Sequence, residues 1–177
     1  MGLDMYLTKT KRVKELQVED YATANNALPW DAKEYDKEGG LKKLCPEIEG
    51  IEQLDEAVHI KGESFKYMTI KEEVGYWRKA NHIHNWFVEK CQDGIDECQL
   101  TEVTQEQLED LLETCYQVVN KKENPEKALP TASGFFFGGT DYDQYYYDDI
   151  KNTIRILEET INKTDWDKEI VFYQSSW

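Results

Sequence analysis

The first residues of the chain alternate between apolar and polar side chains. Apolar residues stand at positions 3, 5 and 7, and a period of two predicts a strand with one face in the core. Residues 56–73 show the same alternation in two short arms, and residues 62–64 between them have the composition of a turn, which predicts a hairpin. We expect Gly75 to end this pattern.

Two further segments have the three- and four-residue spacing of amphipathic helices. Residues 76–92 predict one helix, which Asp93 and Gly94 end. A second helix is expected to open at Thr104, because Gln107 stands three residues further on, the spacing of a capping box. The apolar stripes consist of Tyr76, Ala80, Ile83, His84, Phe87, Val88 and Cys91 in the first helix, and of Leu108, Leu111, Leu112, Cys115, Val118 and Val119 in the second.

The remaining segments complete the predicted fold. Residues 98–103 and 170–177 predict short strands, and Thr140 is expected to cap a third long helix. Residues 15–50 are polar and interrupted by proline and glycine, which predicts short helices and loops. Together these elements predict an α+β fold, a small and mostly antiparallel sheet packed with three longer helices, in a single domain spanning residues 1–177.

Composition narrows the function classes. The 177 residues include 21 Lys and Arg against 36 Asp and Glu, a formal net charge of −15, which argues against a protein that binds nucleic acid through a broad basic face. No apolar run is long enough for a membrane span, and the first residues lack the pattern of a secretory signal. The four cysteines match no zinc-binding spacing, so we expect reduced thiols, no metal and a cytoplasmic protein.

Several sequence blocks are distinctive. They are the start MGLDMY, the segment YWRKANHIHNWFV at residues 76–88, the segments LPT and GFFFG at residues 129–138, and the end YQSSW. Together these blocks resemble a family of small uncharacterised proteins from bacteriophages and prophages of Gram-positive bacteria. The resemblance implies a phage-type gene product that acts in the cytoplasm of a bacterial host cell. It assigns no catalytic residue.

The predicted helix at 76–92 holds the first candidate site. Three basic residues, Arg78, Lys79 and His82, suit an anion such as phosphate, or form a solvated basic edge. His84 lies on the apolar stripe, where a histidine is either a core residue with both nitrogens satisfied or a buried general base. We expect a polar pocket near this helix, with the candidate residues Asp4, Tyr76, Trp77, Arg78, Asn81, His84 and Gln174.

Aromatic and acidic residues supply a second set of candidates. Three phenylalanines at 135–137 stand between glycines, and either one ring points outward to a partner or all three are buried. Residues 89–113 carry nine acids and one base, which indicates either a surface complementary to a basic partner or simple solubility. The candidate partner-binding residues are Glu102, Glu106, Glu109, Asp110, Glu113, Phe136, Tyr145, Asp148 and Asp149.

Two functions follow from these observations. The first is an acidic phage-type protein that binds and modulates a bacterial host protein, in its sharpest form a counter-defence inhibitor that mimics nucleic acid towards a nucleic-acid-binding defence effector. The second is a small-molecule or nucleotide-binding protein, or an enzyme, with a pocket around Arg78 and His84. No nucleophile motif is present, so we expect binding rather than catalysis, with no cofactor and no direct contact with nucleic acid or membrane.

Overall fold

The computed structural model describes residues 2–63 and 65–177. Met1 of the amino-terminal motif and Ser64 of the predicted 62–64 turn lie outside the described residues. The chain folds into two compact units: unit 1 is formed by Met1–Thr8, Glu73–Trp166 and Val171–Trp177, and unit 2 by Lys9–Glu72 and Asp167–Ile170. The single domain expected over residues 1–177 stays a prediction.

A four-stranded antiparallel sheet has the strand order β4-β1-β6-β5. The strands are β1 (Asp4–Lys11), β4 (Glu72–Arg78), β5 (Thr101–Val103) and β6 (Glu169–Ser176). Buried and partly exposed residues alternate along β1, as the period-two pattern predicts. The α+β fold is therefore confirmed, and so are the first strand, the short strand before residue 104 and the closing strand.

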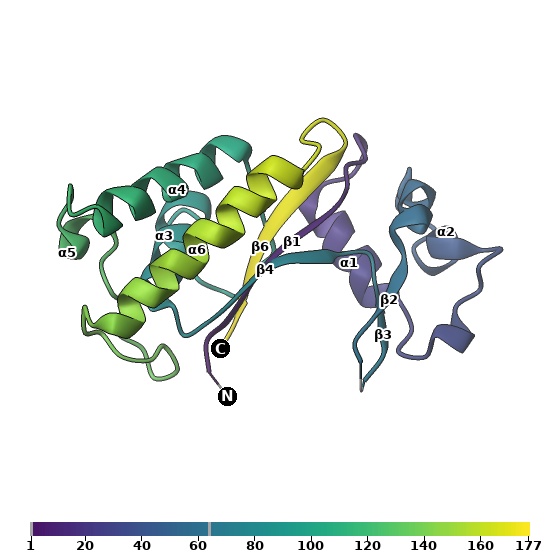
Figure 1. The fold of residues 1–177 in the computed structure, drawn as a ribbon. Helices are drawn as coiled ribbons and strands as arrows, with labels where there is room; N and C mark the ends of the chain where they lie inside the picture. The colour runs from purple at the N-terminus through teal and green to yellow at the C-terminus, as the bar shows by residue number, and fades with distance from the viewer. Residues whose placement is uncertain (1, 64) are drawn as a thin grey trace. The chain divides into compact units, whose positions relative to one another are not determined.

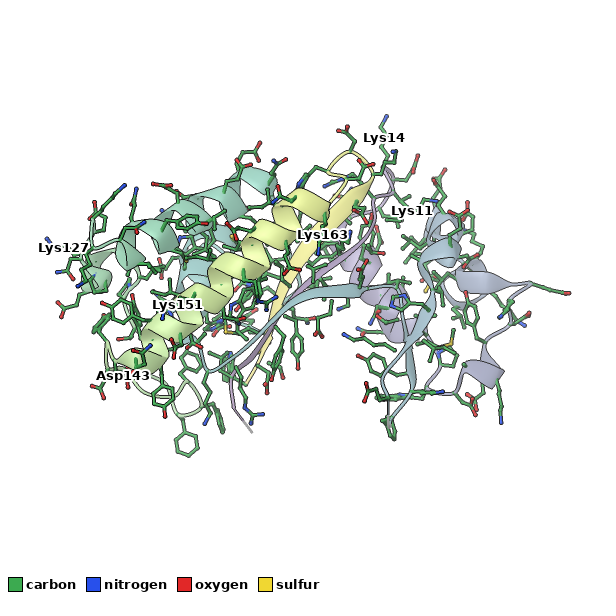
Figure 2. The ribbon with its side chains drawn as sticks, viewed as in Figure 1. Lys11, Lys14, Lys127, Asp143, Lys151 and Lys163 are labelled. Atoms are coloured by element: carbon green, nitrogen blue, oxygen red, sulfur yellow. The ribbon has the colours of Figure 1, made fainter. Side chains whose placement is uncertain are left out.

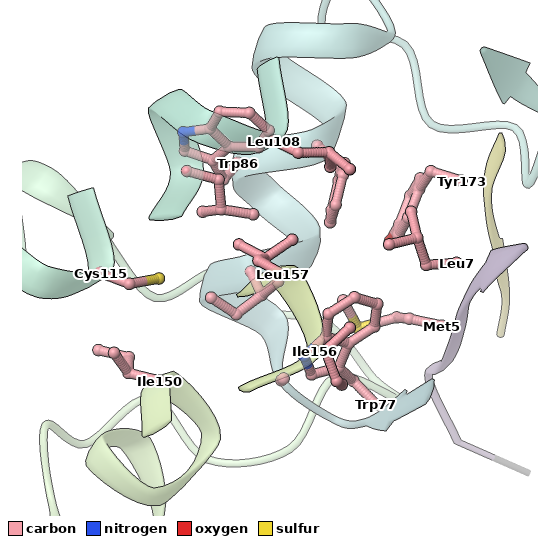
Figure 3. Packing of buried hydrophobic residues seen from close by; sticks show 14 of the residues in the cluster. Met5, Leu7, Trp77, Trp86, Leu108, Cys115, Ile150, Ile156, Leu157 and Tyr173 are labelled. Carbon is pink, nitrogen blue, oxygen red and sulfur yellow. The ribbon is translucent and has the colours of Figure 1, made fainter. Parts of the chain in front are cut away.

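Three long helices of unit 1 enclose its core: α3 (Asn81–Cys91), α4 (Gln105–Val119) and α6 (Gln144–Lys163), with α4 running beside α6 (Figure 1). A one-turn helix, α5 (Pro125–Ala128), follows α4. Apolar side chains from the strands and from all three helices form one buried cluster. Figure 3 shows Trp77 and Ile156 close to Met5, and Leu157 deeper among the helices.

The segment predicted as one helix over 76–92 is a strand followed by a helix. β4 continues to Arg78 and α3 begins only at Asn81. Gly75 does not end the pattern but lies inside β4, where a Cβ atom would collide with the Cγ2 atom of Ile156. Close helix-to-strand approach selects glycine at such a position, and this is why the expected break is wrong.

The helix starts depend on their caps. Thr104 accepts a hydrogen bond from the amide of Gln107, and the capping box predicted for α4 is confirmed. For α6 the cap is Asp143 and not Thr140, because its Oδ1 accepts from the amides of Tyr145 and Tyr146 at 3.0 and 3.2 Å. A carboxylate cap also suits the positive end of the helix dipole.

Unit 2 contains the short elements expected for residues 15–50. They are α1 (Val18–Ala27), η1 (Ala32–Glu34) and α2 (Gly40–Leu44). A further short helix, η2 (Ile51–Ala57), lies beyond that range and includes residues 56 and 57 of the segment predicted as a hairpin, whose strands are β2 (His59–Lys61) and β3 (Tyr67–Thr69). The carboxylate of Asp55 accepts from the amide of Leu41 and the hydroxyl of Tyr35. These two hydrogen bonds connect η2 to the start of α2 and to the end of η1.

Candidate functional site

A cavity of about 300 Å³ lies in unit 1, at the turn from β4 to α3. We call it the turn cavity. It is lined by Arg78, Lys79, Asn81, His82, Thr131, Gly138, Gly139, Asp141, Asp143, Tyr145, Tyr146 and Asp149. Its volume is at the lower end of small-ligand sites. Figure 2 labels Asp143 at the start of α6, and this end of the helix contributes the acidic and aromatic residues.

The backbone reverses sharply between the strand and the helix that carry the basic residues. Lys79 has a φ of 61°, a left-handed conformation that few non-glycine residues adopt. Its amide donates to the carbonyl of Leu3 at 2.8 Å, which fixes the turn against the chain just before β1. The turn brings Arg78 and His82 to the same cavity, although one residue ends a strand and the other begins a helix.

Asn81 fixes the loop that supplies Thr131, Gly138 and Gly139 to the cavity. Its Nδ2 donates to the carbonyls of Phe137 and Gly139 at 3.0 and 2.8 Å. Its Oδ1 accepts from the amide of Ala132 at 3.0 Å. These three hydrogen bonds occupy the amide group of Asn81, which is 2% exposed, so this side chain shapes the cavity rather than offering a free group to a ligand.

His82 is the buried polar group of the turn cavity. Its ring packs on that of Tyr146, with 4.2 Å between centroids, and only 3% of the residue is exposed. Its Nε2 is buried and has no hydrogen-bond partner among the residues that the structure describes. Burial lowers the pKa of His82 to about 3, so the imidazole is neutral at neutral pH. An unpartnered nitrogen of this kind costs about 1–3 kcal/mol.

Both signs of charge line the turn cavity. Arg78 and Lys79 are exposed, and within the described parts of the chain neither forms an ion pair. Asp149 on α6 is half-buried, and desolvation, followed by the nearby Asp148 and Asp143, raises its pKa to about 6. With His82 neutral, the lining has two cations and three carboxylates.

The candidate pocket residues divide between this cavity and other places. Arg78 and Asn81 line it. The carboxylate of Asp4 instead accepts from the hydroxyl of Tyr76. The indole of Trp77 donates to Thr153 in the core. The side chain of Gln174 donates to the carbonyl of Cys98. His84 lies elsewhere in the core. Arg78 and His84 were expected to line the same pocket, but only Arg78 lines the turn cavity.

His84 is the core histidine with both nitrogens satisfied. Its Nδ1 lies 2.8 Å from the hydroxyl of Tyr173 and its Nε2 lies 2.9 Å from Oδ2 of Asp96. The same Asp96 oxygen accepts from the indole of Trp177 at 3.0 Å. Both ring nitrogens are thus engaged within the protein, which leaves no free nitrogen for the alternative role of a general base.

The partner-binding candidates also separate into groups. Glu106, Glu109, Asp110 and Glu113 are exposed on α4, and Glu102 on β5 is half-buried. Asp148 pairs with Lys151 at 3.1 Å, whereas Tyr145 and Asp149 line the turn cavity. Of the three phenylalanines, the outward ring belongs to Phe135, which is 96% exposed, while Phe136 is half-buried.

The sequence predicts an anion site formed by Arg78, Lys79 and His82, and all three residues line the turn cavity. The prediction placed them on one helix, which is wrong because Arg78 belongs to a strand. Sequence reasoning missed Asp141 and Asp143 as lining residues. Their spacing signalled a helix start, which is where they lie, but not what that helix start faces.

The described residues contain no cluster of three or more His, Cys, Asp or Glu side chains that could hold a metal ion, and none of their helices combines the length and the apolar character of a membrane span. All four cysteines are free, and burial raises the pKa values of the Cys91 and Cys115 thiols to about 12, which makes them poor nucleophiles. Comparisons with protein families, curated proteins and solved structures find no match for this chain.

Proposed function

We propose that this protein binds a small molecule with an anionic group in the turn cavity. The observation that supports this best is the buried Nε2 of His82, which has no hydrogen-bond partner within residues 2–63 and 65–177 although His82 lines a cavity. A ligand that forms a hydrogen bond with this nitrogen would offset the loss of stability caused by leaving it unpartnered. Binding sites commonly retain residues that lower the stability of the free protein.

The anionic group is assigned to the basic side of the cavity. Arg78 and Lys79 are free of ion pairs within the described residues, and a guanidinium binds carboxylate or phosphate through two parallel hydrogen bonds. The first turn of α3 lies beside them, and no side chain caps this helix. Its partial positive charge adds to the attraction for an anion.

A calorimetric titration tests this function. The probes are inorganic phosphate, ethyl phosphate, propionate, phosphoethanolamine and β-alanine, offered separately at neutral pH. Loss of a charged hydrogen bond costs about 1.5–3 kcal/mol, so Arg78→Ala should weaken binding about 10- to 100-fold. Arg155→Ala is the matched control, because Arg155 lies on the exposed part of α6 and pairs with Glu159 at 3.3 Å.

The lysine of the turn has a control of its own. Lys79 and Lys121 both have positive φ angles, 61° and 57°, so the substitution by glycine suits the backbone at both positions. Lys79→Gly should weaken binding of the anion, and Lys121→Gly should leave it unchanged. Equal affinities in the wild type, Arg78→Ala and Lys79→Gly would argue against the proposed function.

A second function is supported by a different surface. We also propose that exposed carboxylates of α4 bind a basic surface of a bacterial host protein, as the phage resemblance suggests. Four of them, Glu106, Glu109, Asp110 and Glu113, form no ion pair within residues 2–63 and 65–177. Carboxylates without ion pairs on one helix favour a partner of complementary charge and steer association.

Affinity capture from host lysate, at low and at high salt, tests this second function. The bound protein should be lost at high salt and lost when the four α4 carboxylates are changed to amides. The control variant carries the same change in charge through Glu38, Glu47, Glu49 and Glu52, which are exposed in unit 2. Equal capture by both variants would show that the α4 carboxylates do not select the partner.

A further inference from the structure

The turn cavity presents two sets of opposite charges that do not neutralise each other. Arg78 and Lys79 come from the turn between β4 and α3, and Asp141, Asp143 and Asp149 come from the start of α6 and the residues just before it. No nitrogen of the first set lies within 4.0 Å of a carboxylate oxygen of the second in the described structure. A molecule with only negative charge would meet three carboxylates in the same cavity, which repel it.

We infer that the ligand of the turn cavity is a zwitterion, with an ammonium group as well as a carboxylate or phosphate. This inference rests on the proposed function and adds the chemical class of the ligand. The anionic group lies at Arg78 and Lys79, and the ammonium lies at the start of α6, beside Asp149. Each charged wall of the cavity then has a partner of opposite sign.

Asp149 is the carboxylate best suited to the ammonium group. Asp143 already uses Oδ1 to cap α6, and Asp141 is exposed to water. The Asp149 carboxylate is half-buried and has no hydrogen-bond or ion-pair partner in the described structure. An ammonium group placed beside it would offset the desolvation that raises its pKa.

The aromatic wall of the cavity supports the same orientation. Tyr145 and Tyr146 line the cavity on the helix that carries Asp149, and Tyr145 is 80% exposed. Faces of aromatic rings attract ammonium groups. His82, a neutral imidazole, also lines the cavity and packs against the ring of Tyr146. A cavity of about 300 Å³ suits a molecule of about the size of an amino acid.

Matched pairs of probes that differ only in the amine test this inference. The pairs are phosphoethanolamine with ethyl phosphate, and β-alanine with propionate, so that the two kinds of anion are distinguished. The amine-bearing member of at least one pair should bind about tenfold more tightly to the wild type. Asp149→Asn should abolish this preference and leave the affinity for the amine-free member equal or higher.

Asp148→Asn is the matched control, because Asp148 neighbours Asp149 but pairs with Lys151 and does not line the cavity. It should keep the amine preference. Equal, Arg78-dependent binding of both members of each pair would overturn the inference and leave the proposed function intact. A preference that survives in Asp149→Asn would overturn the assignment to this residue. No binding of any probe at millimolar concentration would overturn both proposals.

Discussion

His84 and Asp96 form a hydrogen bond of 2.9 Å between Nε2 of the imidazole and Oδ2 of the carboxylate. The carboxylate only accepts, so Nε2 carries the hydrogen of this bond, and Nδ1 lies 2.8 Å from the hydroxyl of Tyr173. Burial raises the pKa of Tyr173 well above its ordinary value, which keeps this hydroxyl protonated. A helix, a loop and the last strand are joined through one side chain.

This arrangement predicts a structural role for His84. His84→Leu leaves the hydroxyl of Tyr173 and the carboxylate of Asp96 without their shared partner, and we expect a loss of about 1–3 kcal/mol in the free energy of unfolding. Urea denaturation measures it. Asp93→Asn, in the exposed part of the same loop, should change stability by less than about 0.5 kcal/mol. An unchanged urea midpoint in His84→Leu would contradict the role.

The close approach of α6 to Gly75 predicts that the sheet does not tolerate a larger side chain at this position. Gly75→Ala puts a methyl group against Ile156 of α6, and overpacking of this kind costs about 1–3 kcal/mol. The control is Gly139→Ala, because a Cβ atom at Gly139 meets nothing within 4 Å. Thermal unfolding of the two variants gives the comparison, and a Gly75→Ala variant as stable as the control would show that α6 yields to the methyl group.

His82 predicts a pH dependence of stability. Its pKa is about 3 in the folded protein and 6.5 when unperturbed, so the unfolded chain binds the extra proton as the pH falls below 6.5. The stability of the wild type should therefore decrease on acidification relative to His82→Phe, by about 2 kcal/mol at pH 5. At pH 7 the variant, which removes the unpartnered nitrogen, should be as stable as the wild type or more stable.

Urea unfolding of both proteins between pH 4.5 and 7.5 measures the difference. The raised pKa of Asp149 acts with the opposite sign, since the folded protein then holds the proton more tightly. Comparing two proteins that both retain Asp149 cancels this contribution. A stability difference that stays constant with pH would mean that His82 is not buried in solution.

The hydrogen bonds of Asn81 predict that this side chain holds the loop at residues 131–139 in place. Asn81→Ala removes the hydrogen bonds to Ala132, Phe137 and Gly139, and residues 131–139 should become more open to local unfolding. Chymotrypsin should then cut faster near the phenylalanines of this loop. Asn120→Ala, at the exposed end of α4, serves as the control and should keep the wild-type cleavage rate.

The sequence by itself determined the α+β class and most of its elements. Periods of two and of three to four residues depend on which face of an element is buried, and this shows in the order of residues along β1, α4 and α6. The capping box at Thr104 is likewise a local interaction within one turn. The basic residues of the cavity, Arg78, Lys79 and His82, stand almost next to each other in the chain.

Only the tertiary structure decided which distant segments of the chain contact each other. In the sequence Gly75 resembles a break, but it lies inside β4, which pairs with β1, and the approach of Ile156 from 81 positions further along the chain leaves room only for glycine there. The strand extends to Arg78. Tyr76, the one member of the predicted helical stripe that lies on β4, is 40% exposed, whereas the stripe residues Ile83 and Phe87 on α3 are buried in the core. The acidic wall of the turn cavity comes from the start of α6, more than 60 residues beyond the basic wall. Contacts over such separations depend on chain topology and packing, which local spacing does not encode.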